Sequence, residues 1–224
     1  MSVSELSASN QNYLKAIWGL QEWSDEPITP TAVASKAGVR LSTASDAIRR
    51  LGELGLVEHT RYGAVTLSQQ GHTHALAMVR RHRLIETFLV QVLGYSWDQV
   101  HDEAETLEHA VSDFMVDRID AHLEHPTRDP HGDPIPQPDG TVARPDAVQL
   151  SGVEPGVTVT AERISDHDPD LLRFFAECGI GVGARLEVRA GAPYSGSIEV
   201  MVDGGAPVAL GQPATDAIWV MPVG

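Results

Sequence analysis

The chain has 224 residues, enough for one large domain or two small ones, each able to bury a core. Its formal net charge of -15 and pI near 4.9 argue against the class of proteins that are basic throughout and bind nucleic acid along their whole length. The single cysteine, Cys178, excludes an internal disulfide and a thiolate metal cluster within one chain, which favours a reducing cytosol. Because we find neither a signal pattern nor a membrane-spanning stretch, we expect a cytoplasmic protein without membrane contacts.

The acidic excess lies beyond the first third of the chain. Residues 1–80 hold seven Lys and Arg against seven Asp and Glu, whereas residues 81–119 hold three against eight and residues 120–224 hold six against sixteen. An N-terminal DNA-binding unit is therefore electrostatically possible, and the acidic middle would attract divalent cations.

The first elements predicted along the chain are three helices and two short strands. They cover residues 9–23, 29–37, 41–54, 56–60 and 64–67. Gly38 provides the turn between the second and third helices, and Gly55 ends the third. This order of elements predicts a winged helix-turn-helix.

In a winged helix-turn-helix, the second helix of the motif enters the major groove of DNA. Its exposed face is predicted to carry Ser42, Thr43, Ser45, Asp46, Arg49 and Arg50. The expected phosphate contacts are Lys36, Arg40, Arg49, Arg50 and Arg61. Asp46 either accepts from a cytosine amino group or orients a neighbouring arginine. The alternative is a winged helix that binds protein.

Metal-ligand chemistry is concentrated in two further predicted helices, 68–93 and 97–123. His82 and Glu86 are four residues apart in the first, and His101, Glu105, Glu108 and His109 form one helical stripe in the second. Imidazole nitrogen and carboxylate oxygen without thiolate suit Mn²⁺, Fe²⁺, Co²⁺ or Zn²⁺. The alternative is a solvated acidic face with incidental histidines.

These helices also carry more apolar side chains than a small domain needs, which predicts a homodimer and suits a palindromic operator. The residues concerned are Leu84, Phe88, Leu107, Val111, Phe114 and Ile119.

Beyond these helices, the composition of the chain changes. Pro and Gly dominate residues 125–145, which predicts an extended connector. Short β-type runs beyond it, with one helix over 169–177, predict a small five-stranded SH3-like β-barrel. The fold class is mainly α with a small all-β domain. The expected domains are a winged helix over 1–74, dimerisation and metal-binding helices over 75–125, a Pro-rich linker over 126–149 and an SH3-like domain over 150–224.

In this order, the residues resemble the diphtheria toxin repressor family of metal-dependent transcriptional repressors, and in particular its manganese-responsive branch. The likeness runs nearly end to end. Its most specific parts are Tyr13-Leu-Lys-Ala-Ile-Trp18, Arg81-His-Arg-Leu84, Val100-His-Asp-Glu-Ala104 with Glu108-His109, and Pro130-His-Gly-Asp-Pro-Ile-Pro136.

The resemblance implies two metal sites. Glu105, Glu108 and His109 would form the primary, activating site together with Asn12 of the first helix. Iron-responsive members carry cysteine and methionine where Glu105 and Asn12 stand, so the oxygen donors here favour Mn²⁺ over Fe²⁺. Manganese-type relatives carry Asp at the position of Asn12. The alternative for Asn12 is a helix residue without metal contact.

The ancillary site implied by the resemblance comprises His82, Glu86 and His101, completed by the C-terminal domain. An ungapped alignment puts Asp168 on the acidic ligand and Leu171, which cannot coordinate, on an amide ligand. Asp166 or His167 could compensate, and the alternative role for Asp168 is a helix cap. We expect His131, in the Pro-rich segment, to be structural.

The function implied is a homodimeric repressor for which Mn²⁺ is the corepressor, acting on promoters of manganese uptake genes. Alternatives are an iron-dependent repressor of the same family and a winged-helix regulator that answers an organic ligand. A di-metal oxidase would need Glu-x-x-His pairs, and the metal-binding helices contain none. We therefore expect neither catalysis nor a small organic substrate.

Overall fold

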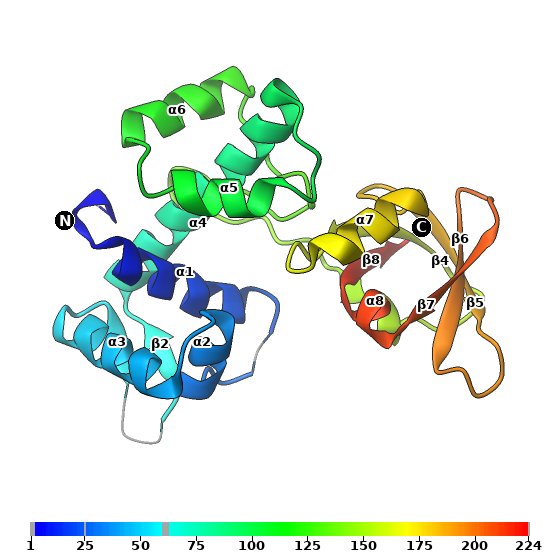
Figure 1. Cartoon of the computed structure of the whole chain (residues 1–224), viewed down its shortest axis with the longest axis horizontal. Helices are drawn as coiled ribbons and strands as arrows, with labels where there is room; N and C mark the ends of the chain where they lie inside the picture. Colours follow the sequence, from blue (N-terminus) through cyan, green and yellow to red (C-terminus); the bar gives the residue numbers. More distant parts are fainter. Residues whose placement is uncertain (1–2, 25, 60–62, 224) are drawn as a thin grey trace. The chain divides into compact units, whose positions relative to one another are not determined.

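The computed structural model describes residues 3–24, 26–59 and 63–223, and Figure 1 labels its helices and strands. The chain forms two compact units. The first unit comprises Met1–His82, Thr106–Arg118 and Pro136–Val142. The second comprises Arg83–Glu105, Ile119–Ile135 and Ala143–Gly224. The long helix α4 (Gln69–Leu93) contributes to both units.

The first unit contains the predicted winged helix. A short 3-10 helix, η1 (Val3–Glu5), is followed by α1 (Ala8–Glu22), α2 (Pro30–Lys36), α3 (Leu41–Glu53) and the antiparallel strands β1 (Val57–His59) and β2 (Val65–Leu67). The hydroxyls of Ser7 and Thr29 cap α1 and α2 by accepting from backbone N–H groups. The core beneath these helices includes Leu14, Ile17, Ile48, Leu51 and Val65.

Helix α4 begins where the wing ends. The Ser68 hydroxyl accepts from the Gly71 N–H at 3.0 Å and so caps the helix. A Cβ on Gly71 would lie 1.9 Å from the Leu56 carbonyl oxygen, so glycine is needed for α4 to start so close to the backbone just before β1.

The helix predicted over 97–123 is two helices, α5 (Val100–Leu107) and α6 (Asp113–His122). Between them, the N–H groups of Ala110 and Val111 both donate to the Leu107 carbonyl. The Ser112 hydroxyl then caps α6 by accepting from the Met115 N–H. The prediction of one helix was therefore wrong, and the second half of the expected metal stripe lies in this turn, residues 108–112.

The apolar residues assigned to a dimer surface divide between core and surface. Leu84 and Ile119 are buried, so the structure corrects that assignment for these two. Phe114 on α6 is 74% exposed, and Phe88 is half-buried.

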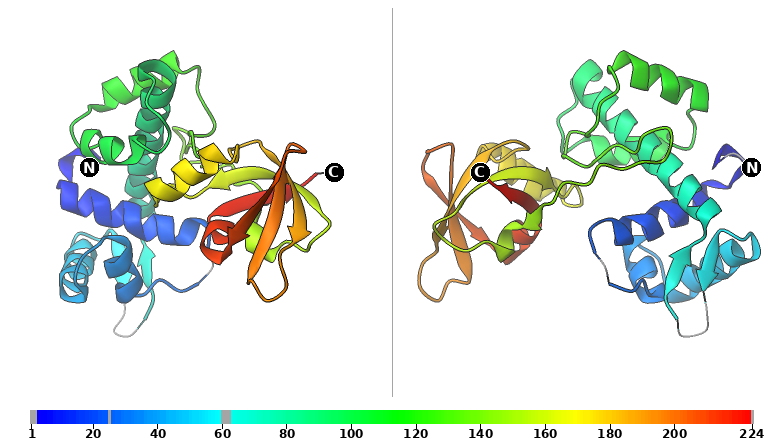
Figure 2. Two further views of the ribbon diagram at one scale, coloured as in Figure 1. Left: turned by 45° about the vertical axis from the view of Figure 1, so that its right-hand side comes forward. Right: turned by 180° about the vertical axis from the view of Figure 1, so that it is seen from behind.

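The second unit contains a six-stranded antiparallel sheet in the order β3-β8-β4-β5-β6-β7. Its elements are β3 (Val148–Gln149), η2 (Leu150–Gly152), β4 (Thr158–Ile164), α7 (Pro169–Glu177), β5 (Arg185–Ala190), β6 (Ser197–Val202), β7 (Pro207–Gly211), α8 (Gln212–Asp216) and β8 (Ile218–Pro222). The sheet is strongly twisted (Figure 2).

The structure corrects the predicted barrel. Within residues 148–222, β3 and β7 do not pair with each other, so the sheet stays open. Strands β3 and β7 and helix α8 were not predicted from the sequence: β3 has only two residues, and β7 contains Pro, Ala and Gly, which are poor strand formers. The core of this domain includes Leu172, Phe175, Leu186 and Val200.

The Pro-rich segment is not the predicted extended connector over its first half. The Asp129 carboxylate accepts from the N–H groups of His131 and Asp133, both at 2.9 Å, and closes a compact loop. A Cβ on Gly132, at φ +89°, would lie 2.1 Å from the Glu162 carbonyl oxygen. The loop is therefore packed directly against β4, and His131 to Pro136 are buried.

Among the described residues, no helix is both long and apolar enough to cross a membrane.

Candidate metal centre

The turn after α5 presents a fully buried carboxylate, that of Glu108. Lys15 of α1 donates to both of its oxygens, at 2.7 and 2.8 Å, and His82 Nδ1 of α4 lies 2.6 Å from Oε2. Burial alone would raise the pKa of Glu108, but the hydrogen bonds and charges of His82 and Lys15 outweigh burial and lower it. The carboxylate is thus ionised and needs positive charge around it.

His109, the next residue, offers an imidazole nitrogen suited to a metal. Its Nδ1 donates to the Gln11 side-chain oxygen at 2.7 Å, which leaves the lone pair on Nε2. That Nε2 is buried without a hydrogen-bond partner among the described residues, 3.6 Å from Glu108 Oε1. An orphaned imidazole nitrogen beside an ionised carboxylate fits a divalent cation.

Arg81 of α4 binds the backbone of this turn. Its guanidinium donates to the Glu108 carbonyl at 3.1 Å and to the Ser4 hydroxyl at 3.3 Å, and it forms an ion pair with Asp113. The backbone of Glu108 is therefore held by a buried cation that does not touch its carboxylate.

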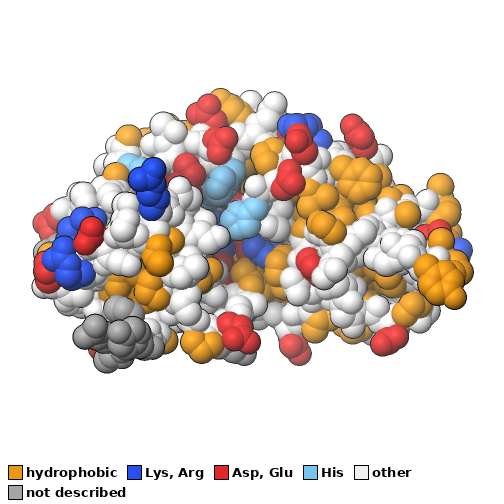
Figure 3. Space-filling model, turned by 60° about the horizontal axis from the view of Figure 1, so that its bottom comes forward, with side chains coloured by type: hydrophobic (Ala, Val, Ile, Leu, Met, Phe, Trp, Pro, Cys, Tyr) orange, Lys and Arg blue, Asp and Glu red, His pale blue; other side chains and the backbone are white. Residues whose placement is uncertain are grey.

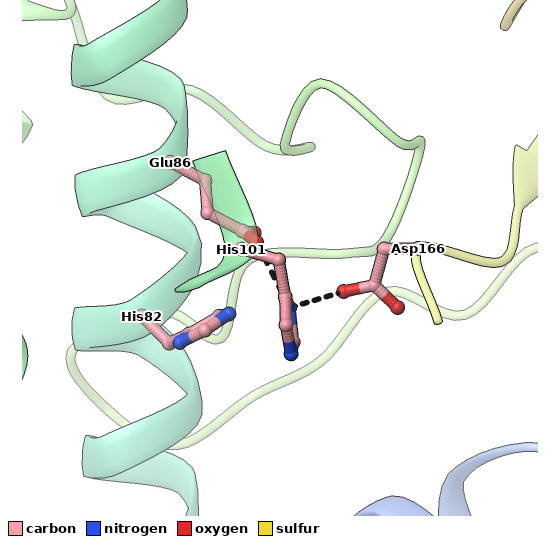
Figure 4. Close-up of side chains that lie close together, drawn as sticks. All are labelled: His82, Glu86, His101 and Asp166. Carbon is pink, nitrogen blue, oxygen red and sulfur yellow. Dashed lines mark ion pairs between the residues drawn. The ribbon is translucent and has the colours of Figure 1, made fainter. Parts of the chain in front are cut away.

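The second unit contains its own cluster, built from Glu86 of α4, His101 of α5 and Asp166, which follows β4 (Figure 4). His101 Nδ1 lies 2.8 Å from Asp166 Oδ2 and 3.5 Å from Glu86 Oε1. Burial lowers the pKa of His101, but the hydrogen bonds and charges of Asp166 and Glu86 outweigh this and raise it to about 10. Burial raises the pKa of Asp166, yet the imidazolium of His101 holds it well below its usual value.

Glu86 belongs to a second group with Asp129 and His131, in which one ligand atom from each lies within 4.8 Å of the others and all three residues are buried. His131 Nε2 donates to the Trp97 carbonyl at 2.8 Å. Its Nδ1 is buried, 4.0 Å from Glu86 Oε2, and has no hydrogen-bond partner in the described part of the chain. Burial, then the charges of Asp133 and Glu86, raises the pKa of Asp129 well above its usual value and outweighs the guanidinium of Arg83, whose Nε lies 3.6 Å from Asp129 Oδ2.

Two predicted residues lie elsewhere. Asn12 is exposed, because one residue along α1 turns its side chain by about 100° from Gln11, the residue that contacts His109. Asp168 is also exposed and caps α7 by accepting from the N–H groups of Asp170 and Leu171. In the structure Gln11 contacts His109 and Asp166 contacts His101, whereas Asn12 and Asp168 are exposed.

The other predicted ligands are located as follows. Glu105 Oε1 lies 3.9 Å from His101 Nε2, one turn further along α5. His82 precedes Glu86 by one turn of α4 and is drawn beside it in Figure 4. The residue types and their spacing did not indicate Gln11, Lys15 or Asp129, and His131 was expected to be structural. The only signal for the loop residues was the Asp129-Pro-His-Gly-Asp133 run.

The exposed face of α3 matches the predicted DNA-contacting residues. Ala44, Ala47, Ile48 and Leu51 are buried, whereas the six predicted residues are exposed: Ser42, Thr43, Ser45, Asp46, Arg49 and Arg50. Lys36 and Arg40 are exposed as well, and Arg61 lies outside the described residues.

The cations on α3 have acidic neighbours. Arg49 pairs with Glu53 at 3.0 Å and with Asp46 at 3.4 Å, and Arg50 Nε lies 3.5 Å from the Asn10 side-chain oxygen. Basic and acidic side chains accordingly lie together over the winged helix, on the left of Figure 3. In the structure Asp46 orients an arginine, one of its two predicted roles.

Comparison with known proteins follows the same division of the chain. Residues 5–65 match the family described as iron dependent repressor, N-terminal DNA binding domain, and residues 68–137 match its metal binding and dimerisation domain. Residues 148–222 match the FeoA domain. The diphtheria toxin repressor of Corynebacterium jeikeium is 32% identical over 74% of this chain and 70% of its own length. The chain belongs to the diphtheria toxin repressor family.

Two further relatives match almost the whole of this chain. The iron-dependent repressor IdeR of Mycobacterium leprae is 29% identical over 97% of this chain and 99% of its own. A solved structure described as a manganese-dependent transcriptional repressor complex with manganese is 56% identical, with a TM-score of 0.91, covering 96% of this chain and all of that one.

As a member of the diphtheria toxin repressor family, the protein is a metal-dependent transcriptional repressor. Its family consists of transcriptional regulators, which are not enzymes. The matched domains imply operator DNA and a second copy of the chain as its partners. The family, the fold class and this function confirm the predictions from sequence.

Proposed function

We propose that the repressor is activated by Mn²⁺. The observation that carries the proposal is the donor chemistry: both clusters combine buried carboxylates with imidazoles, and the chain's one cysteine belongs to neither. A similar solved structure is described as a complex with manganese, which supports this metal. Fe²⁺, Co²⁺ and Zn²⁺ accept the same donors and are the competing ions.

The primary site, in this proposal, consists of Glu105, Glu108 and His109 with an amide from α1. The orphaned Nε2 of His109 and the buried Glu108 carboxylate support two of these ligands. Gln11 already fixes the His109 ring, so it supports the site at least as an orienting group, and Asn12 is the competing amide.

The ancillary site would comprise His82, Glu86 and His101, with Asp166 as its acidic group in place of Asp168. The contacts of His101 with Asp166 and Glu86 support this assignment. Asp129 and His131 are candidates for the same site because they share Glu86 with it.

DNA affinity would depend on metal through α1. This helix packs against α2 and α3 and also contacts the turn after α5 through Gln11 and Lys15. The metal would supply positive charge to Glu105 and Glu108. A ligand changes affinity for DNA only if it favours the conformation that binds DNA, so α1 is the element through which the turn would bias the recognition helix α3. A homodimer would place two such helices on a palindromic operator upstream of manganese uptake genes.

Binding to a DNA fragment upstream of a manganese uptake gene tests the proposal, with Mn²⁺, Fe²⁺, Zn²⁺ or a chelator present. We expect DNA binding that requires Mn²⁺ and is lost in Glu108→Ala, while Glu103→Ala, an exposed glutamate on α5, behaves as the unmodified protein. Activation by Fe²⁺ but not Mn²⁺ would favour the iron-dependent alternative, which the IdeR relatives support. Binding that ignores every metal would overturn the proposal.

A further inference from the structure

Lys15 holds both oxygens of the carboxylate that the proposed primary site requires. Its Nζ lies 2.7 Å from Oε1 and 2.8 Å from Oε2 of Glu108, and 3.3 Å from His82 Nδ1. Glu108 is fully buried, and only 16% of the Lys15 side chain is exposed. The ion pair is therefore largely removed from water, where its electrostatic interaction is strong.

An ammonium in this position and a divalent cation exclude each other. Both need the same carboxylate oxygens, and two positive charges so close together repel each other strongly where little water screens them. Arg81, a second buried cation beside the turn, bonds the Glu108 carbonyl, so it does not compete for the carboxylate. His82 Nδ1 lies 2.6 Å from one carboxylate oxygen, Oε2, whereas Lys15 bonds both. Lysine has a flexible four-carbon stem, which lets its charge move toward water without moving α1.

We propose that Lys15 is a built-in counter-cation that occupies Glu108 in the metal-free repressor, and that its displacement sets the metal concentration to which the protein responds. This inference rests on the proposed role of Glu108 as a metal ligand. It assigns Lys15 two effects: it stabilises the metal-free protein by neutralising a buried carboxylate, and it weakens metal binding by competition.

The chain offers an internal control, since it has two lysines, Lys15 and Lys36. Lys36 ends α2 and is exposed. The first test is acetylation of the full-length protein by an amine-reactive reagent at one pH, with chelator or saturating Mn²⁺, read by peptide mass spectrometry. Without metal, we expect Lys15 to react more slowly than Lys36. Bound Mn²⁺ should make Lys15 react several-fold faster than it does without metal, while the rate of Lys36 stays constant. A Lys15 rate that Mn²⁺ leaves unchanged or lowers would overturn the proposal.

The second test compares Lys15→Met, Lys15→Arg and Lys36→Met. In Lys15→Met we expect Mn²⁺ to bind about tenfold more tightly, because no ammonium competes, and the chelator-treated protein to melt at a lower temperature. Lys15→Arg keeps the charge, so its affinity should stay near that of the unmodified protein, and Lys36→Met should change neither quantity. Unchanged or weaker Mn²⁺ binding in Lys15→Met would overturn the role of Lys15. If Lys15→Met does not fold, the labelling experiment decides alone.

Glu108→Gln separates this failure from failure of the proposed function. If Glu108→Gln loses a Mn²⁺ site and Lys15→Met binds as before, only the Lys15 proposal is wrong. If Glu108→Gln binds Mn²⁺ like the unmodified protein, Glu108 is not a ligand, and both proposals are overturned.

Discussion

Gln11 and Lys15, one helical turn apart on α1, make the contacts between that helix and the turn after α5. Gln11 determines which nitrogen of His109 carries the proton, and Lys15 neutralises Glu108. Orienting groups of this kind keep a ligand's lone pair directed at its ion, so they affect metal affinity without any bond to the metal.

Gln11→Ala should weaken Mn²⁺ binding at the Glu108 site about tenfold to a hundredfold, because His109 loses the partner that fixes its tautomer and ring position. Asn12→Ala is the matched control one residue along the same helix, and we expect little effect from it. Titration with detection of free Mn²⁺ measures both variants. A large loss in Asn12→Ala with none in Gln11→Ala would return the ligand role to Asn12.

Asp166 and Asp168 provide a second comparison at this scale. Asp166→Asn removes the carboxylate that raises the pKa of His101, so this pKa should fall from about 10. Because the same change removes the proposed acidic ligand, Mn²⁺ binding at this cluster should weaken. Asp168→Asn should leave both unchanged, since asparagine also caps helices. Titration of His101 by NMR and of Mn²⁺ by calorimetry measures the two effects. An undisturbed His101 in Asp166→Asn would contradict the assignment.

At the scale of elements, the loop from Asp129 to Pro136 contributes two candidate metal ligands that lie in no helix or strand. Its carboxylate turn and its close approach to β4 bring His131 and Asp129 to Glu86. The loop needs glycine at position 132 for two separate reasons, a positive φ and the proximity of the Glu162 carbonyl.

Gly132→Ala and Gly156→Ala separate these reasons. Both glycines have similar positive φ angles, +89° and +96°, but the space around Gly156 is open whereas Gly132 meets backbone at 2.1 Å. Gly156→Ala should cost about 1–2 kcal/mol of unfolding free energy from backbone strain alone. Gly132→Ala should cost clearly more and also weaken Mn²⁺ binding. Denaturant unfolding of the two variants measures the loss of unfolding free energy. Equal losses would mean that the proximity of Gly132 to the Glu162 carbonyl does not affect stability.

Helix α3 is an element whose cations are partly neutralised by acids on the same helix. Glu53→Gln should release Arg49 from its 3.0 Å ion pair, tighten binding to DNA at low salt, and steepen the salt dependence by up to about 0.9 log units per log unit of salt. Glu103→Gln on α5 serves as the control of equal charge change. Binding measured at several salt concentrations gives the slope. An unchanged slope would show that Arg49 makes no phosphate contact.

For the whole molecule, metal binding should stabilise both compact units, because Glu108 belongs to the first and Asp166 to the second. At a free Mn²⁺ concentration about 100 times its dissociation constant, a site stabilises the folded state by about 2.7 kcal/mol. In hydrogen-exchange experiments, Glu108→Gln should abolish the Mn²⁺-dependent protection of the first unit, and Asp166→Asn that of the second. Protection that disappears everywhere in both variants would instead show that the two sites act as one.

The winged helix, α4 and α7 follow from sequence because their signals are local. Apolar spacing, the caps Ser7 and Thr29, and the glycines at positions 38 and 55 all act within a few residues. The break at residues 108–112 was missed because the apolar pattern continues through it. The order of the strands and the openness of the sheet were missed since pairing partners lie far apart in the chain.

By itself, the sequence determined the winged helix, the family and the chemical type of the metal donors, because residue type and helical periodicity are properties of short segments. The tertiary structure alone decided which side chains meet: Gln11 rather than Asn12 beside His109, Asp166 rather than Asp168 beside His101, and Lys15 on Glu108. A shift of one or two residues turns a side chain to another face, and only packing between distant segments selects the face that points inward.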